Sequence, residues 1–169
     1  MRFPARWLCF AAGAVALEAG LLRAALLELG FDMDNPSADC SAEEGWQVLG
    51  RLAQLNAPHL EEGMAQKEFG RKLAGALREK NLIKPAHLRL VHCLPGPLRM
   101  LSLQKLASGT PFAYEYTRES AGLWKLRFEG GVLMPFSVGL WEVLSEWLGK
   151  RWVVSAGPMP DAVLFVQEV

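Results

Sequence analysis

Residues 112–128 read FAYEYTRESAGLWKLRF and contain the clearest structural signal in this chain. Apolar and polar residues alternate on both sides of the turn at 119–122, so that Trp124, Leu126 and Phe128 fall between Lys125, Arg127 and Glu129. A repeat of two places alternate side chains on opposite faces of a strand. The stretch therefore predicts a β-hairpin with one apolar face and one polar face.

The residues after this hairpin extend the pattern to residue 169. An apolar stripe with helical spacing runs from Phe136 to Leu148 and ends before Gly149. Alternation returns at 152–156, and the apolar stretch 163–166 predicts a last strand that is central or covered on both faces. We expect residues 110–169 to form a ββαββ unit with a four-stranded antiparallel sheet.

Residues 1–108 are patterned as helices. We expect a first helix at 11–29 with Gly30 as its C-cap, and a second helix opened by a capping box at Ser41–Glu44. A third helix should begin near Glu61 and Glu62, and the sequence predicts further helices at 85–94 and 98–106. The predicted fold is a single α+β domain over 1–169, with four or five helices before the ββαββ unit.

Composition excludes several classes of protein. Eighteen basic residues balance eighteen acidic ones, which gives no excess of positive charge for nucleic acid and mildly favours self-association. Cys9, Cys40 and Cys93 form no CxxC pair, which fits a reducing compartment, and we therefore expect a cytoplasmic protein. The segment 2–16 also resembles a secretory signal, although its pattern continues as a helix. No apolar run is long enough for a membrane span.

Motifs for catalysis or metal binding are missing from the sequence, which favours a protein that is not an enzyme. The adjacent His92 and Cys93 would point about 100° apart on a helix, a poor arrangement for an activated thiolate. His59, His87 and His92 have no same-face spacing for a metal site. A haem needs only one axial histidine, so haem remains the alternative to our prediction of no cofactor.

A ligand pocket should lie between the helices and the sheet, where binding sites commonly form. The residues that we expect near it are Phe69, Arg71, Cys93, Phe136 and Trp141. Trp141 lies at the edge of its helix stripe, and an exposed aromatic residue there would mark a partner surface or a pocket rim.

Four stretches resemble a known family. They are EAGLLRA at 18–24, LNAPHL at 55–60, AQKEFGR at 65–71 and PFSVGL at 135–140. In these the chain resembles a family of bacterial domains known mainly as a large paralogous set in myxobacteria, for which no activity is established. Its element order is also similar to vinyl-reductase-type domains, haem-NO-binding-associated domains and vesicle-tethering subunits. Those resemblances imply small apolar ligands or dimerisation through helices.

The predicted function is a non-enzymatic intracellular domain that binds a small apolar ligand or acts as a sensory or regulatory module, with a homodimer as its expected assembly. The alternative is a protein–protein interaction module without a pocket, such as an adaptor or an immunity-like inhibitor. An exposed apolar patch without an enclosed pocket would favour the alternative.

Overall fold

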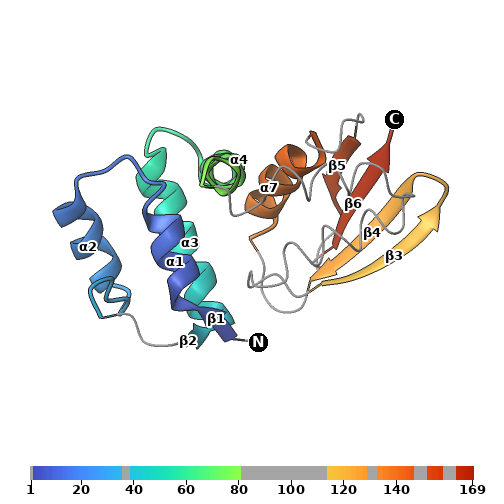
Figure 1. Cartoon of the computed structure of the whole chain (residues 1–169). Coiled ribbons are helices and arrows are strands. Elements are labelled where there is room, and N and C mark those ends of the chain that lie inside the picture. The colour runs from blue at the N-terminus through green and yellow to red at the C-terminus, as the bar shows by residue number, and fades with distance from the viewer. Residues whose placement is uncertain (1, 36–38, 81–113, 129–132, 147–151, 158–162) are drawn as a thin grey trace.

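The computed structural model describes residues 2–35, 39–80, 114–128, 133–146, 152–157 and 163–169. The elements, in chain order, are β1 (Arg2–Pro4), α1 (Ala5–Ala12), α2 (Ala19–Leu27), β2 (Asp39–Ser41), α3 (Ala42–Asn56), α4 (Glu62–Glu79), β3 (Tyr114–Ser120), β4 (Leu123–Phe128), α7 (Met134–Glu146), β5 (Trp152–Ala156) and β6 (Val163–Glu168). The α+β class is confirmed. Figure 1 shows α1 to α4 grouped on one side, which we call the helical half, and β3 to β6 with α7 on the other, which we call the sheet half.

The prediction of one helix over 11–29 is wrong. The chain forms α1 and α2 instead, and the amides of Ala14 and Val15 make short-range bonds to carbonyls three residues back as α1 ends. This break lets two differently oriented helices bury apolar residues, because α1 buries Leu8 fully while α2 buries Leu22 and Leu26. The apolar spacing on either side of the break is the same, so periodicity alone does not reveal it.

The predicted cap at Gly30 is confirmed. Gly30 has a φ of 77°, its amide donates to the carbonyl of Leu27, and the amide of Phe31 donates to the carbonyl of Leu26. This is the Schellman arrangement, in which glycine supplies the left-handed conformation that other residues adopt only with strain. It brings the buried side chains of Phe31 and Leu26 into the same core cluster.

A small sheet that the sequence did not predict anchors the N-terminus. Strands β1 and β2 pair antiparallel, with Phe3 opposite Cys40. Phe3 is fully buried and lies so close to α3 that a Cβ on Gly45 would collide with its ring. The capping box predicted at Ser41–Glu44 follows directly and is confirmed, since each side chain bonds the backbone amide of the other residue.

In the sheet half, four antiparallel strands lie in the order β3-β4-β6-β5. The last strand, β6, lies between two neighbours, and its residues Val163, Leu164 and Val166 are buried, as its continuous apolar sequence predicts. The turn between β3 and β4 contains Gly122 with a φ of 76°, a conformation that favours glycine. Helix α7 packs against β5 and β6.

Helices α4 and α7 form the most extensive contact between the two halves among the described elements. Two glycines allow it. A Cβ on Gly70 would collide with the carbonyl oxygen of Phe136, and a Cβ on Gly139 would collide with the carbonyl oxygen of Lys67. The two helices therefore meet backbone against backbone, which only glycine permits at these positions.

The candidate helices at 85–94 and 98–106 lie outside the described residues. Within the described part of the chain, no helix is long and apolar enough to cross a membrane.

Candidate functional site

A groove of about 880 Å³ opens between α3 and α4 in the helical half. Its lining consists of Leu29, Ala42, Glu43, Trp46, Gln47, Gly50, Arg51, Gln54, Glu62, Gln66 and Leu133. This volume lies within the range of about 300–1,000 Å³ that is usual for small-molecule sites. Leu133 immediately precedes α7, so the groove reaches the border with the sheet half.

One face of α3 forms the length of the groove. Ala42, Trp46 and Gly50 follow one another at intervals of four residues and provide an apolar rank. Beside these residues, a row of polar side chains follows the same spacing along α3 and consists of Glu43, Gln47 and Arg51. From Ala42 to Gly50 the helix rises about 12 Å, since each residue adds about 1.5 Å. The groove is thus elongated, with an apolar floor and a polar margin.

Gly50 sets the depth of the groove at its centre. A Cβ on Gly50 would lie 3.6 Å from Cδ1 of Leu133, an ordinary contact distance. The position therefore accepts a small side chain without collision, while a larger side chain would occupy the space of a ligand.

Gln66 supplies a buried polar group in this lining. Only 5% of the residue is exposed, and its Nε2 donates to Oε1 of Glu62 at 3.0 Å. Because the amide nitrogen is committed to this bond, the amide orientation is fixed and its oxygen is presented as an acceptor. Polar groups of this kind orient ligands in otherwise apolar pockets.

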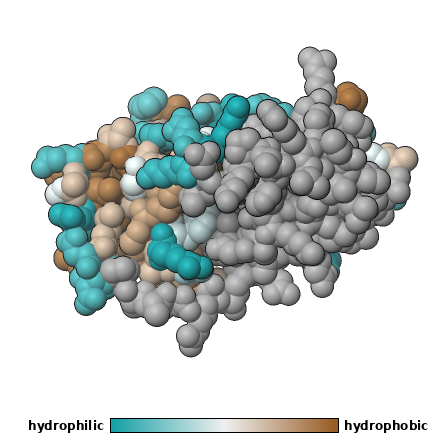
Figure 2. All heavy atoms as spheres, in the orientation of Figure 1, coloured by the Kyte–Doolittle hydropathy of each residue, from teal (hydrophilic) through white to brown (hydrophobic). Residues whose placement is uncertain are grey.

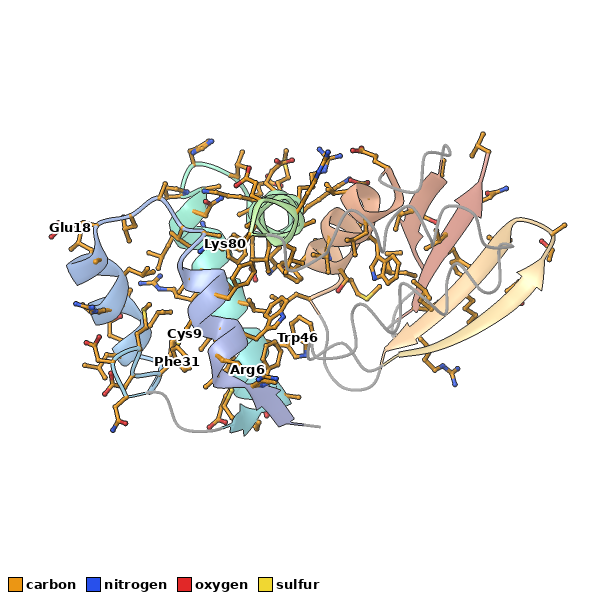
Figure 3. The ribbon with its side chains drawn as sticks, in the orientation of Figure 1. Arg6, Cys9, Glu18, Phe31, Trp46 and Lys80 are labelled. Atoms are coloured by element: carbon orange, nitrogen blue, oxygen red, sulfur yellow. The ribbon has the colours of Figure 1, made fainter. Side chains whose placement is uncertain are left out.

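Trp46 connects the groove to the aromatic core. Its ring packs edge-to-face on Phe3 at 5.4 Å and on Phe136 at 6.3 Å between ring centroids. Figure 3 shows Trp46 extending from α3 toward the side on which α7 lies. These contacts fix the position of the indole, because edge-to-face pairs have a preferred geometry.

Two of the predicted site residues, Phe69 and Phe136, come together. Both are fully buried, and their ring centroids lie 6.0 Å apart across the α4–α7 contact. Trp141 is only 2% exposed, so it does not provide the exposed aromatic side chain that would mark a partner surface or a pocket rim. Cys93 lies outside the described residues. The described lining of the groove does not include Phe69, Phe136 or Trp141. Phe136 does pack against Trp46, which lines the groove.

Arg71, the remaining predicted residue, binds Glu142 of α7. Its Nη2 and Nε lie 2.7 and 2.9 Å from Oε2 of Glu142, and Nζ of Lys67 lies 2.8 Å from Oε1. Partial burial raises the pKa of Glu142, but the hydrogen bonds and positive charges of Lys67 and Arg71 outweigh it and lower the pKa below its ordinary value. The hydrogen bonds to Glu142 raise the pKa of Arg71. Arg71 therefore serves the α4–α7 contact.

The groove residues Glu62, Gln66 and Gly50 were not predicted. The pair of carboxylates at 61 and 62 was attributed to the start of a helix, which is correct for α4. The sequence did contain one signal for this part of the site. Gln66 follows Glu62 by four residues, a spacing that brings the two side chains together on one face of a helix. The predicted pocket between the helices and the sheet stays a prediction.

Solved structures with the same fold are H-NOX domains. A Cs H-NOX mutant containing 4-cyano-L-phenylalanine has 13% sequence identity and a TM-score of 0.60, and the match covers 98% of this chain and 96% of that chain. A second structure, from work on how porphyrin distortion by the protein modulates haem redox potential, also has 13% sequence identity and a TM-score of 0.60. That match covers 98% of this chain and 99% of the other. This chain shares the H-NOX fold.

A further structure, an H-NOX protein from S. oneidensis in the Fe(II)NO ligation state, has 14% identity and a TM-score of 0.53 over 85% of this chain and 86% of that chain. No protein-family profile matches this chain, and no curated protein matches its sequence. The H-NOX matches are consistent with a fold like that of haem-NO-binding domains, whereas the predicted resemblance was to haem-NO-binding-associated domains. The resemblance to the myxobacterial set stays a prediction.

Proposed function

We propose that this chain is a non-enzymatic sensory or regulatory domain that binds a small molecule in the groove between α3 and α4. The groove itself is the observation on which the proposal rests. It combines a ligand-sized volume, an apolar floor around Trp46 and the buried, oriented amide of Gln66. The fold supports it, because the H-NOX structures described above include proteins that hold haem or a nitrosyl iron.

The lining also favours binding over catalysis. Among the described residues around the groove, the polar side chains are glutamines, two glutamates and one arginine. The described lining contains no Ser, Cys, Thr, Lys, His or Tyr, so the carboxylates of Glu43 and Glu62 are its only described side chains of a type that forms covalent intermediates. We include a cytoplasmic location in the proposal, since the three cysteines of the sequence form no CxxC pair and fit a reducing compartment.

Haem is not the ligand that the groove residues fit. Proteins hold haem iron through His, Cys, Met or Tyr, and none of these types lines the groove in the described part of the chain. His59 is exposed in the turn between α3 and α4, and His87 and His92 lie outside the described residues. A Soret band in protein supplied with haem would support the haem alternative, and no band would oppose it.

A groove-filling variant with a matched control tests the proposal. We expect the neutral apolar fluorescent probe N-phenyl-1-naphthylamine to bind wild-type protein, and Gly50→Leu to weaken this binding at least about tenfold by occupying the groove. Gly75→Leu is the control, because Gly75 lies inside α4 and a Cβ there would meet none of the described residues within 4 Å. Equal probe binding by wild type and Gly50→Leu would contradict the groove as the binding site.

A different surface supports two further proposals, the homodimer expected for this domain and the alternative function of a protein-interaction module. Leu21 and Leu27 of α2 are 59% and 61% exposed, and α2 buries only Leu22 and Leu26. Figure 2 shows apolar surface on the helical half, at the left of the view, between hydrophilic side chains. Light scattering that shows a dimer in the wild type and a monomer in the Leu21→Gln/Leu27→Gln variant would support a homodimer through α2, and a wild-type monomer would oppose it.

A further inference from the structure

We infer that the groove recognises an organic cation, a primary amine or guanidine attached to an apolar body. This inference rests on the function proposed above and specifies its ligand class. Its basis is the balance of hydrogen-bond acceptors and donors in the lining, taken together with the shape of the groove.

Among the described residues that line the groove there are two carboxylates, Glu43 and Glu62, against one guanidinium, Arg51. In the described part of the chain, neither carboxylate forms an ion pair, whereas Arg51 lies 3.9 Å from the carboxylate of Glu28. The negative charge of the lining is therefore available, and the positive charge is already partly compensated. Glu43 and Glu62 lie in the first turns of α3 and α4.

Gln66 adds a buried hydrogen-bond acceptor beside Glu62. Its Nε2 donates one of its two N–H groups to Oε1 of Glu62, and its side-chain oxygen is an acceptor for a donor on the ligand. A buried acceptor next to a carboxylate matches an ammonium or guanidinium group, which carries several N–H donors and no acceptor. The same pair of groups would repel a carboxylate head group.

The apolar rank accounts for the body of the ligand. Leu29 and Leu133 contribute to the walls, and Ala42 and Trp46 form part of the floor along about 12 Å of α3. A chain or ring attached to the cationic group can lie along this floor while the polar margin of α3 faces solvent. A small inorganic cation would leave the apolar floor unused.

Three probes with one chain length separate these contributions. Octylammonium, 1-octanol and octanoate differ in their head groups and share the same apolar tail. We expect calorimetric titration of the whole chain below the micellar concentration to show octylammonium binding about tenfold or more tightly than 1-octanol, because a hydrogen bond to a charged group is stronger than a neutral one. Octanoate should bind more weakly than either.

Two neighbouring carboxylates provide a matched pair of variants. Glu62→Gln should reduce the preference for octylammonium over 1-octanol to within about twofold, because it removes the charge and retains the side-chain size. Glu61→Gln should leave the preference unchanged, since Glu61 is exposed, precedes α4 and does not line the groove. Both variants change one exposed residue, so we expect both to fold.

The outcomes distinguish the inference from the proposed function. Equal binding of octylammonium and 1-octanol, with both blocked by Gly50→Leu, would overturn the cation preference and leave the groove as a binding site. Tighter binding of octanoate would likewise overturn it. Failure of all three probes, together with no effect of Gly50→Leu on the fluorescent probe, would instead contradict the proposed function itself.

Discussion

The backbone contact between α4 and α7 predicts opposite effects for the same substitution at two positions of one helix. Gly70 and Gly75 both lie inside α4, and sequence alone assigns each the same helix-propensity cost. The structure separates them. A Cβ on Gly70 would collide with the carbonyl oxygen of Phe136 and lie 2.9 Å from the amide nitrogen of Leu140, whereas a Cβ on Gly75 would have no atom of the described chain within 4 Å.

The magnitudes follow from two opposing terms. Alanine in a helix interior is more favourable than glycine by about 0.8–1 kcal/mol, so Gly75→Ala should stabilise the protein by up to about 1 kcal/mol. Overpacking costs about 1–3 kcal/mol, and the upper end applies to Gly70 because the backbone of Phe136 cannot rotate away. Subtracting the helix gain leaves Gly70→Ala destabilised by about 2 kcal/mol. The two variants should therefore differ by about 3 kcal/mol.

Urea unfolding followed by circular dichroism measures this difference directly. For a chain of this size, 1 kcal/mol corresponds to a shift in Tm of about 2–4 °C, so thermal unfolding gives a second readout. Gly70→Ala should unfold at lower urea concentration and temperature than wild type, and Gly75→Ala at equal or higher values. A Gly70→Ala protein as stable as wild type would refute the reasoning, because it would mean that the helices do not meet through the backbone at this position.

Two further predictions concern single contacts. The lowered pKa of Glu142 means that its contribution to stability is present above the pKa of the unfolded chain and is lost as pH falls through the folded value. Glu142→Gln should therefore cost about 1 kcal/mol at pH 7 and flatten the decrease in urea midpoint that the wild type shows on acidification below about pH 5; an unchanged pH profile would contradict the assignment. Ser41→Ala should destabilise the protein by about 1 kcal/mol because it removes the α3 cap, and Ser41→Thr should retain most of the stability in the same thermal assay.

Local chemistry explains which parts of the fold the sequence could predict. The capping box at Ser41–Glu44 and the glycine cap at Gly30 involve residues within a few positions of one another, so their sequence signatures are complete. The covered last strand was predictable because its continuous apolar sequence has no polar face to expose. These features need no knowledge of which distant segments meet.

Features that depend on distant contacts were missed. The pairing of Phe3 with Cys40 in the small sheet joins segments that carry no mutual signal in one sequence. Trp141 was placed at the edge of a helix stripe, but α7 is covered on more than one side, by α4 and by the strands, which leaves this residue buried. The site was missed for a similar reason, because Gln66 and Trp46 belong to different helices and meet only through the packing of α3 on α4.

Glycines show how differently one residue type can contribute to this domain. At Gly70 the backbone of α7 occupies the place of the missing Cβ, and at Gly50 the missing Cβ leaves part of the groove open. At Gly75 a Cβ would meet no neighbour within 4 Å in the part of the chain that the structure describes. All three lie within helices, where glycine has the same local cost. Gly50 and Gly70 therefore have a benefit that offsets this cost, access to the groove at one position and the α4–α7 contact at the other. Because the two benefits are separate, a side chain at Gly50 should impair binding without loss of stability, and a methyl group at Gly70 should impair stability without entering the groove.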